Sequence, residues 1–413
     1  MRKATSLFAI VLLLANSLPL HAYDRQAHRE IAQRAAQPSV SSLDQVLKDE
    51  LQLPAGIAEA FPGRSVPGQR RIEQLIGDGA LFEDSLDTRV LNHFHNPLLD
   101  PWDEAGLRAL PLLGFGLIRG QSSVLWQQNP AQDSSLVFTP IPILSGGGNW
   151  SWQDARRHYL NALTRPRLED RDTEEGRDRA FADTFEALGH LTHLIQDASV
   201  PAHVRNDPHP FLRRDWYEDW VEQTRQGSAP KFRALLNAEP SRPTFSIFTP
   251  TGNARAPLPI ARLLDTDAFL GRDPDVLTQQ NIGIAEYTNG NFLSRGTRFR
   301  TFALPQPTSL DVGPVIEVEP GKFRRYFTKS REGATITHFA TEGMLFDSVV
   351  AVRGAPLPTS GWILDKLVHE DYARNLLPRA VGYSAALLDY FFRGKLDVDL
   401  IEADPNDPSV VRL

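Results

Sequence analysis

The stretch GHLTHLIQDASVPAHVRND, residues 189–207, places three histidines close to Asp197 in the chain. On an α-helix His193 and Asp197 lie one turn apart, where two side chains can hold the same metal ion. Pro201 disfavours helical backbone in the residue before it, so the chain should turn and bring His203 back beside the helix end. Histidine and carboxylate ligands without cysteine suit Zn²⁺. The sequence therefore predicts a helix that ends in a metal site.

The helix expected over Asp178–Ser199 has two stripes. Phe181, Phe185, Leu188 and Ile195 form an apolar stripe, and Glu186, His190, His193 and Asp197 form a polar one on roughly the opposite side. A polar stripe is usually exposed to solvent, but it then consists mostly of Lys, Glu, Arg and Gln. Because this stripe contains histidines, it is either a solvated surface or part of a metal site. His190 either orients a ligand or lies at the edge of the core.

The composition excludes several classes of protein. The chain has 413 residues, of which 41% are hydrophobic and 23% charged, and it contains no cysteine. It is therefore not a disordered chain, a collagen-like repeat, a disulfide scaffold or a cysteine-ligated metal protein. No stretch after the N-terminal apolar run approaches the roughly 20 apolar residues of a membrane helix.

The first 22 residues have the pattern of a secretory signal peptide. Two basic residues precede an apolar run over Leu7–Leu14, and Ala22 offers a small residue for cleavage. We expect a secreted or periplasmic protein that begins at Tyr23. Removal of Arg2 and Lys3 changes the formal net charge from −7 to −9, which argues against a strong nucleic-acid binder.

The chain is expected to be mainly α-helical, with an irregular, partly β insertion. Helices are predicted over 23–36, 70–75, 152–163, 178–199, 216–236, 362–376 and 380–392, with a break at Pro378 and a long loop over 119–149. Residues 23–237 form the predicted catalytic region, and 331–413 contribute helices that pack on it. Between them, residues 238–330 hold ten prolines from Pro240 to Pro320, and IEVEPGKFRRYF predicts a hairpin that turns at Pro320-Gly321.

Two more segments offer ligands. LFEDSLDTRVLNHFHNP, residues 81–97, contains Glu83, Asp84, His93 and His95. Apolar neighbours suggest a partly buried site, where carboxylates are costly unless paired or bound to a cation. His95 either approaches this site or lies on the surface. RRDWYEDWVE starts a helix that carries Glu218, which is either a ligand or a solvated residue.

These residues resemble the zinc-dependent phospholipase C and single-strand nuclease superfamily. Its signature His-x3-Asp-x3-Pro-x-His is present as His193, Asp197, Pro201 and His203. NHFHNP resembles the family segment whose first histidine, here His93, binds zinc. GALFED resembles the segment whose final aspartate, here Asp84, bridges two zinc ions and orients the attacking water. Tyr23 and His28 resemble the mature N-terminus, where the first residue binds zinc through its amino nitrogen and carbonyl oxygen.

The resemblance implies a multi-helical fold around up to three Zn²⁺ ions. It assigns one ion to Asp84, His93, His193 and Asp197, a second to Tyr23, His28 and Asp197, and a third to His203, Glu218 and His209. The family usually has a histidine four residues before the last glutamate, where this chain has Arg214. His209 therefore either reaches the third ion from a loop or the third site is weakened.

The implied activity is hydrolysis of a phosphodiester, with Asp84 as the catalytic residue that positions the nucleophile. A phospholipase C that acts on phospholipid head groups, with transient contact to a membrane surface, is favoured by the acidic charge and the NHF segment. A single-strand nuclease or 3′-nucleotidase is favoured by the spacing of Tyr23 and His28. A non-catalytic exported zinc protein is the third alternative, which the residue at position 214 motivates.

Overall fold

The computed structural model describes residues 25–84, 88–109, 118–130, 132, 135–138, 141–144, 148, 150–164, 174–208, 215–243, 260–271, 273–278, 281–295, 309–342, 362–393, 401–402 and 411–412. Within these residues the protein is mainly helical, as expected. The predicted signal peptide, Tyr23 and His209 lie outside the described residues. No helix in the described part of the chain combines the length and apolar character needed to span a membrane.

Most of the chain's regular structure is in α-helices. They are α2 (Arg25–Ala35), α3 (Leu43–Asp49), α4 (Ile72–Glu83), α5 (Ser123–Trp126), α6 (Trp152–Thr164), α7 (Glu174–Asp197), α8 (Pro201–Val204), α9 (Trp216–Gly227), α10 (Ala229–Leu236), α11 (Ala261–Leu264), α12 (Ile284–Asn291) and α14 (Lys366–Phe391). Short 3-10 helices cover Gly56–Ala58, Thr88–Asn92, Trp102–Glu104 and Pro274–Thr278. The helix expected to end at residue 75 thus continues as α4 to Glu83, which carries the chain to the predicted ligand Asp84.

The strands are short except in one sheet. They are β1 (Ala60–Pro62), β2 (Gln69–Arg71), β3 (Arg108–Ala109), β4 (Ile118–Arg119), β5 (Ser135–Phe138), β6 (Ile141–Leu144), β7 (Leu310–Glu319), β8 (Lys322–Lys329), β9 (Ile336–Glu342), β10 (Trp362–Ile363), β11 (Ile401–Glu402) and β12 (Val411–Arg412). The long loop predicted over 119–149 was therefore wrong in part, because this region contains α5 and the paired strands β5 and β6.

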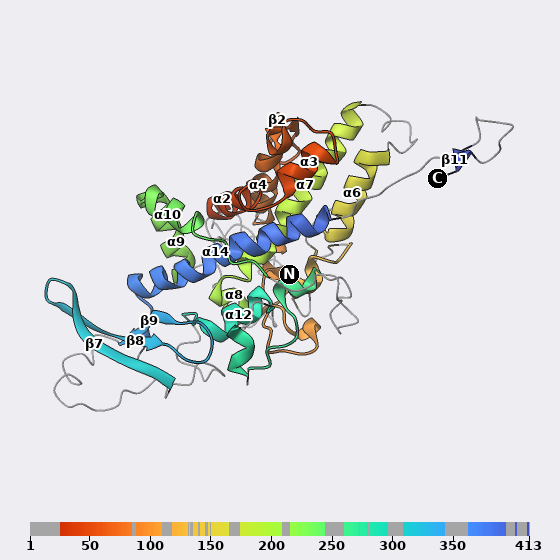
Figure 1. Cartoon of the computed structure of the whole chain (residues 1–413). Coiled ribbons are helices and arrows are strands. Elements are labelled where there is room, and N and C mark those ends of the chain that lie inside the picture. The colour runs from red at the N-terminus through yellow and green to blue at the C-terminus, as the bar shows by residue number, and fades with distance from the viewer. Residues whose placement is uncertain are drawn as a thin grey trace, which may run out of the picture.

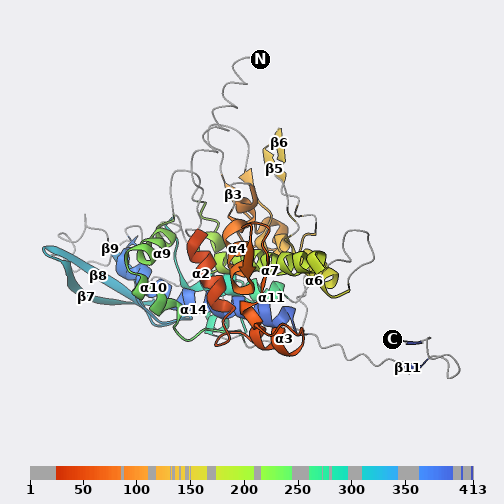
Figure 2. The same ribbon diagram turned by 90° about the horizontal axis from the view of Figure 1, so that it is seen from above.

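Helix α7 is the central element of the fold. It packs against α4 on one side and α6 on another, and α2 lies beside α4 (Figures 1 and 2). The predicted apolar stripe is confirmed, since Phe181, Phe185, Leu188 and Ile195 are fully buried. The polar stripe is not solvated either: His190, His193 and Asp197 are buried as well. Burial of these groups excludes the wet-surface interpretation of this helix.

The crossing of α4 and α7 depends on two glycines. A Cβ atom on Gly189 would overlap the carbonyl oxygen of Ile76, and one on Gly79 would overlap the carbonyl oxygen of Glu186. The backbones of the two helices therefore touch, which only glycine permits. This close approach places the C-terminal end of α4 against the His193 side of α7.

Helix α14 is continuous through Pro378, so the predicted break there was wrong. Proline removes one helical hydrogen bond and usually kinks or ends a helix. Here Leu376, Leu377 and Val381 on both sides of the proline are fully buried, and their burial outweighs that local loss. The helix also starts later than predicted. It begins at Lys366, after Asp365, whose carboxylate accepts hydrogen bonds from the main-chain N–H groups of the first turn.

The predicted helix over residues 216–236 is divided into α9 and α10 at Ser228. Pro230 lies in the first turn of α10, where its missing N–H costs nothing because the first N–H groups of a helix have no internal partner. A single continuous helix would have placed this proline in its interior, where it is destabilising. The consequence is that α9, with Glu218, is oriented independently of α10.

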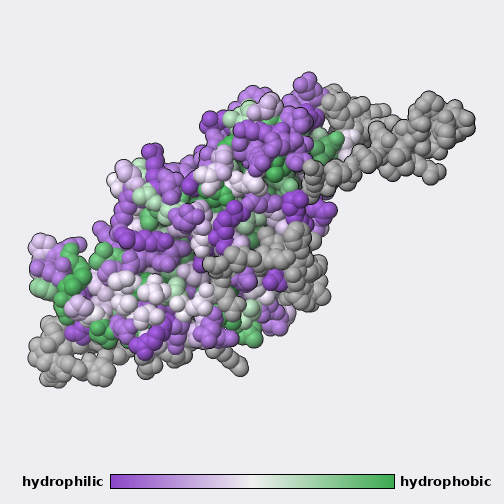
Figure 3. Space-filling view, viewed as in Figure 1, coloured by the Kyte–Doolittle hydropathy of each residue, from purple (hydrophilic) through white to green (hydrophobic). Residues whose placement is uncertain are grey.

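An antiparallel sheet of order β10-β9-β8-β7 extends from the helical part (Figure 1). The predicted hairpin is confirmed: β7 pairs with β8, and Glu319 lies opposite Lys322 across a turn at Pro320-Gly321. The boundary drawn at residue 330 falls inside this sheet, because β8 pairs on its other side with β9. Val312, Val315, Ile316 and Phe323 are exposed on the hairpin, where Figure 3 shows a group of apolar atoms at its left edge.

Candidate metal centre

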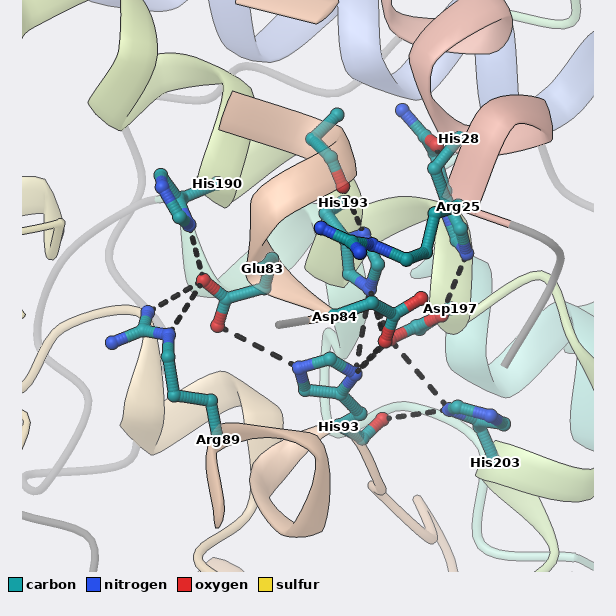
Figure 4. A network of polar contacts seen from close by, with 12 residues as sticks. Arg25, His28, Glu83, Asp84, Arg89, His93, His190, His193, Asp197 and His203 are labelled. Atoms are coloured by element: carbon teal, nitrogen blue, oxygen red, sulfur yellow. Dashed lines mark hydrogen bonds and ion pairs between the residues drawn. The ribbon is translucent and has the colours of Figure 1, made fainter. Parts of the chain in front are cut away.

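Seven of the nine predicted ligands converge in the interior of the helical part, and Figure 4 labels all of them except Glu218. They are His28 of α2, Asp84 at the end of α4, His93, His193 and Asp197 of α7, His203 of α8, and Glu218 of α9. We call these seven side chains the metal centre. All seven are at least 97% buried, so the interpretation of Glu218 as a solvated residue was wrong. Because Tyr23 and His209 lie outside the described residues, their predicted roles remain predictions.

The metal centre contains three groups whose ligand atoms lie within 4.8 Å of one another. The first group is His28, Asp84 and His193; the second is His93, His193 and Asp197; the third is Asp197, His203 and Glu218. His193 and Asp197 each belong to two groups, so the three groups form one continuous cluster. Each group has the three protein ligands that a catalytic metal site requires, and could hold a metal ion.

Asp197 lies at the middle of this cluster. Its Oδ2 is 2.8 Å from Nδ1 of His93 and 3.1 Å from Nε2 of His193, and its Oδ1 is 3.5 Å from Nε2 of His28. These are ion-pair distances, and within the described residues neither oxygen of Asp197 has a partner that meets strict hydrogen-bond geometry. Both oxygens of Asp84 show the same property. Buried carboxylates without hydrogen-bond donors are costly and indicate a cation.

Three histidines are oriented by contacts between Nδ1 and an oxygen atom, and Nδ1 of His203 also lies 3.7 Å from Oδ2 of Asp197. Nδ1 of His193 donates to the carbonyl oxygen of Ala80 at 2.6 Å, and Nδ1 of His203 donates to the carbonyl oxygen of His93 at 3.2 Å. Nδ1 of His28 lies 2.8 Å from the amide oxygen of Gln196. Because a carbonyl oxygen only accepts, the proton of each neutral ring is on Nδ1 and the lone pair of Nε2 faces the carboxylates. This is the arrangement of metal-binding histidines in proteins.

His93 is turned the other way, and Glu83 faces its outer nitrogen. Nδ1 of His93 points at Asp197, while Nε2 lies 3.6 Å from Oε1 of Glu83. Glu83 accepts hydrogen bonds from Nε of Arg89 at 3.0 Å and from Nε1 of Trp126 at 3.1 Å. Burial alone would raise the pKa of Glu83, but the charge of Arg89 and the bond from His190 hold that pKa well below its usual range. An ionised carboxylate therefore orients His93.

The sequence placed Glu83 among the residues of the predicted site but gave it no role. Its position beside Asp84 in GALFED and six residues before Arg89 was visible, but the partner His93 lies across a turn that no local pattern specifies. His190 was predicted either to orient a ligand or to lie at the edge of the core. It is buried and its Nδ1 binds Glu83, so it supports the residue that orients His93. Its ring is stacked on Trp150 with a centroid distance of 4.6 Å.

Two other residues of the predicted polar groups lie outside the metal centre. Glu186 accepts hydrogen bonds from the main chain of Arg64 and from Ser65, on a different side of α7. His95 is 1% exposed and is bound to Ser122 and Asp265, so the surface alternative for this histidine was wrong. Neither residue belongs to the three groups.

Protons and carboxylates balance each other in the metal centre. Burial raises the pKa of Asp84 to about 6. Burial would lower the pKa of His93, but Asp197, Glu83 and Asp84 raise it to about 10. The neighbouring histidines hold the pKa of Asp197 well below its usual range, although burial acts in the opposite direction. Against the effect of burial, the pKa of His193 is raised as well, by Asp197 and Asp84, whereas burial lowers the pKa of His28 and that of His203. Protons on His93 and His193 thus offset the carboxylate charge, and a metal ion would bind by displacing them.

Glu83→Gln is expected to weaken metal binding about 10- to 100-fold, because it removes the charge that orients His93 while keeping the shape of the side chain. The measurement is competition with a chromogenic chelator at a temperature where the variant is folded. Glu186→Gln is the matched control, since it changes a buried glutamate of α7 that faces away from the metal centre. Equal losses in both variants would show that Glu83 has no specific role.

Comparisons of the chain with protein-family models, with curated proteins and with solved structures found no match.

Proposed function

We propose that this protein is an exported, zinc-dependent phosphodiester hydrolase with the multi-helical fold of the superfamily that its motif resembles. The observation that carries the proposal is the orientation of His193 and His203. Each donates from Nδ1 to a main-chain carbonyl oxygen and directs Nε2 at buried carboxylates. Histidines that bind a metal ion almost always donate their other ring N–H in this way.

The donor set supports zinc as the metal. Four imidazoles and three carboxylates form the metal centre, and the chain has no cysteine. Zinc accepts these ligands in sites with three protein ligands and one open position. Three overlapping groups are consistent with up to three ions, with Tyr23 and His209 as further ligands. His28 belongs to the first group and also lies 3.5 Å from Asp197, so both Asp84 and Asp197 are proposed to share its ion.

The chemistry follows from the metal and from Asp84. Zinc lowers the pKa of a bound water to about 7, which makes hydroxide available at neutral pH, and stabilises negative charge on phosphate oxygens. Asp84 lies 3.5 Å from both His93 and His193, and within the described residues its oxygens accept no hydrogen bond. Its carboxylate can therefore accept a hydrogen bond from the nucleophilic water and align it with phosphorus.

The substrate proposed first is a phospholipid head group, with transient contact to a membrane surface, because the net charge of −9 after removal of Arg2 and Lys3 disfavours a polyanion. A single-strand nuclease or 3′-nucleotidase uses the same centre and is the second candidate. The third group of the metal centre retains Asp197, His203 and Glu218. The presence of three ligands in this group supports an enzyme over a non-catalytic zinc protein.

A substrate panel tests the proposed function. Phosphatidylcholine, single-stranded DNA and 3′-AMP are each incubated with the full mature chain, with and without a chelator, and zinc is counted by elemental analysis. We expect hydrolysis of at least one substrate that the chelator abolishes and added zinc restores. One tightly bound ion without turnover of any substrate would favour the non-catalytic alternative, and turnover insensitive to chelation would contradict zinc catalysis.

The proposed role of Tyr23 predicts that its α-amino group must be free. An α-amino group has a pKa of about 7.7–8.0, so a metal displaces its proton easily at neutral pH, whereas a peptide nitrogen has no available lone pair. Protein with extra residues before Tyr23 should bind one zinc ion fewer and be at least about tenfold less active, although equally helical. Proteolytic removal of the extension should restore both. Equal zinc content and rate in the two forms would exclude Tyr23 as a ligand.

A further inference from the structure

His95 lies beside the metal centre without belonging to any of its three groups. Its ring is held at both nitrogens: Nδ1 is 2.8 Å from Oγ of Ser122, and Nε2 is 2.6 Å from Oδ2 of Asp265. All three side chains are at most 1% exposed. The rings of His95 and Trp102 also pack edge to face, with a centroid distance of 5.7 Å, which leaves the imidazole little freedom to rotate. These contacts fix the position of residue 95.

The segment 93–95 in turn holds His203 at three points. The main-chain nitrogen of His95 donates to the carbonyl oxygen of His203 at 3.1 Å. Nδ1 of His203 donates to the carbonyl oxygen of His93 at 3.2 Å. The ring of Phe94 is stacked on that of His203, with a centroid distance of 4.5 Å and an angle of 4°. A displacement of His95 therefore moves both His93 and His203.

Asp265 is itself held rigidly by the loop that follows α11. Its Oδ1 accepts a hydrogen bond from the main-chain nitrogen of Asp267 at 2.7 Å. The next turns wrap around the buried carboxylate of Glu286, which accepts bonds of 2.6–2.8 Å from the main-chain nitrogens of Thr266, Ala268, Phe269 and Gly283 and from Oγ1 of Thr266. A carboxylate buried with this number of donors shapes the loop around itself.

We infer that Asp265 is a positioning residue of the metal centre, which acts through His95 on the zinc ligands His93 and His203. The inference rests on the proposed function, since it requires that these two histidines bind zinc. It gives residues 260–271 and Glu286, which lie inside the region expected to be an irregular insertion, a structural role in the metal centre. Their role is to hold the 93–95 segment at the distance from α8 that both ligands need.

The first measurement is zinc affinity in the full mature chain, by competition with a chromogenic chelator. Asp265→Ala leaves Nε2 of His95 without its partner, and we expect about 10- to 100-fold weaker binding. Asp265→Asn keeps a hydrogen-bonding group at the same place and should remain within about threefold of the wild type. Asp154→Ala is the matched control, because Asp154 is a buried aspartate that bonds only to its neighbours at the start of α6 among the contacts described.

A double-mutant cycle separates positioning from a general loss of stability. If Asp265 acts through His95, Asp265→Ala adds nothing to the loss caused by His95→Ala. Additive effects, wild-type affinity in Asp265→Ala, or an equal loss in Asp154→Ala would each overturn the inference. If Asp265→Ala does not fold, Ser122→Ala, which removes the bond at the other ring nitrogen, should weaken zinc binding in the same direction, and unchanged affinity would count against the inference.

A readout without metal keeps this result distinct from the proposed function. In the metal-free protein, Asp265→Ala should shift the ring NMR signals of His93 and His203, and Asp154→Ala should leave them unchanged. If the wild type binds no zinc, the proposed function fails, and the ring signals alone decide whether Asp265 positions these two histidines. Unshifted signals in Asp265→Ala would contradict the positioning role.

Discussion

Asp197→Asn is expected to abolish turnover while the helical fold remains. Asp197 belongs to two of the three groups and lies within 3.5 Å of ring nitrogens of His28, His93 and His193. The amide keeps the shape of the carboxylate but removes the negative charge that neighbouring ions would share. We expect the rate to fall more than about 100-fold, beyond the loss typical of a residue that only orients a ligand, together with a loss of bound zinc.

The measurement combines initial rates on the best substrate of the panel with zinc content and circular dichroism. Asp154→Asn serves as the control, because Asp154 is also a fully buried aspartate but lies at the start of α6. It should retain zinc and activity. A variant Asp197→Asn that keeps most of its activity would show that the assignment of the metal centre is wrong.

Gly189→Ala should destabilise the whole protein and disturb the metal centre at the same time. The new Cβ would overlap the carbonyl oxygen of Ile76 and lie 2.8 Å from the main-chain nitrogen of Ala80. Both are backbone atoms of α4, so relief requires the two helices to separate. Overpacking of this kind costs about 3 kcal/mol. Separation of the helices also moves Ala80 away from the Nδ1 of His193 that it orients.

Chemical denaturation and zinc titration measure the two effects. Gly227→Ala is the matched control, since a Cβ on Gly227, at the end of α9, would meet no atom within 4 Å. This control should be neutral or stabilise the protein by up to about 1 kcal/mol. Equal stability of the two variants would mean that α4 and α7 can separate without cost.

The ligands on α7 and α8 could be predicted because their spacing is local. A helix fixes the relation of His193 to Asp197, and Pro201 ends the helix soon enough for His203 to return. His28, Asp84, His93 and Glu218 required the resemblance, since nothing in their own segments says which distant residues they meet. The mainly helical fold could also be predicted from the sequence, because helices depend on patterns that repeat within a few turns.

The supporting residues could not be predicted, because their contacts join distant segments. Glu83 orients His93 across a turn, and Asp265 reaches His95 from a region that local composition marked as irregular. The helix break at Pro378 was wrong for the same reason. The local preference of proline was visible, whereas the burial that keeps α14 continuous arises from the tertiary fold.

The wide spacing of the metal ligands along the chain has a consequence for the order of folding. A zinc finger takes its ligands from one short segment and folds around the ion. Here the ligands extend from His28 to Glu218, so the ends of long loops must meet before any group is complete. Ion capture is then a late step, which follows the packing of α2, α7 and α9. Contacts that form so late mainly slow unfolding, so a bound metal ion would lengthen the lifetime of the folded protein and leave its folding rate almost unchanged.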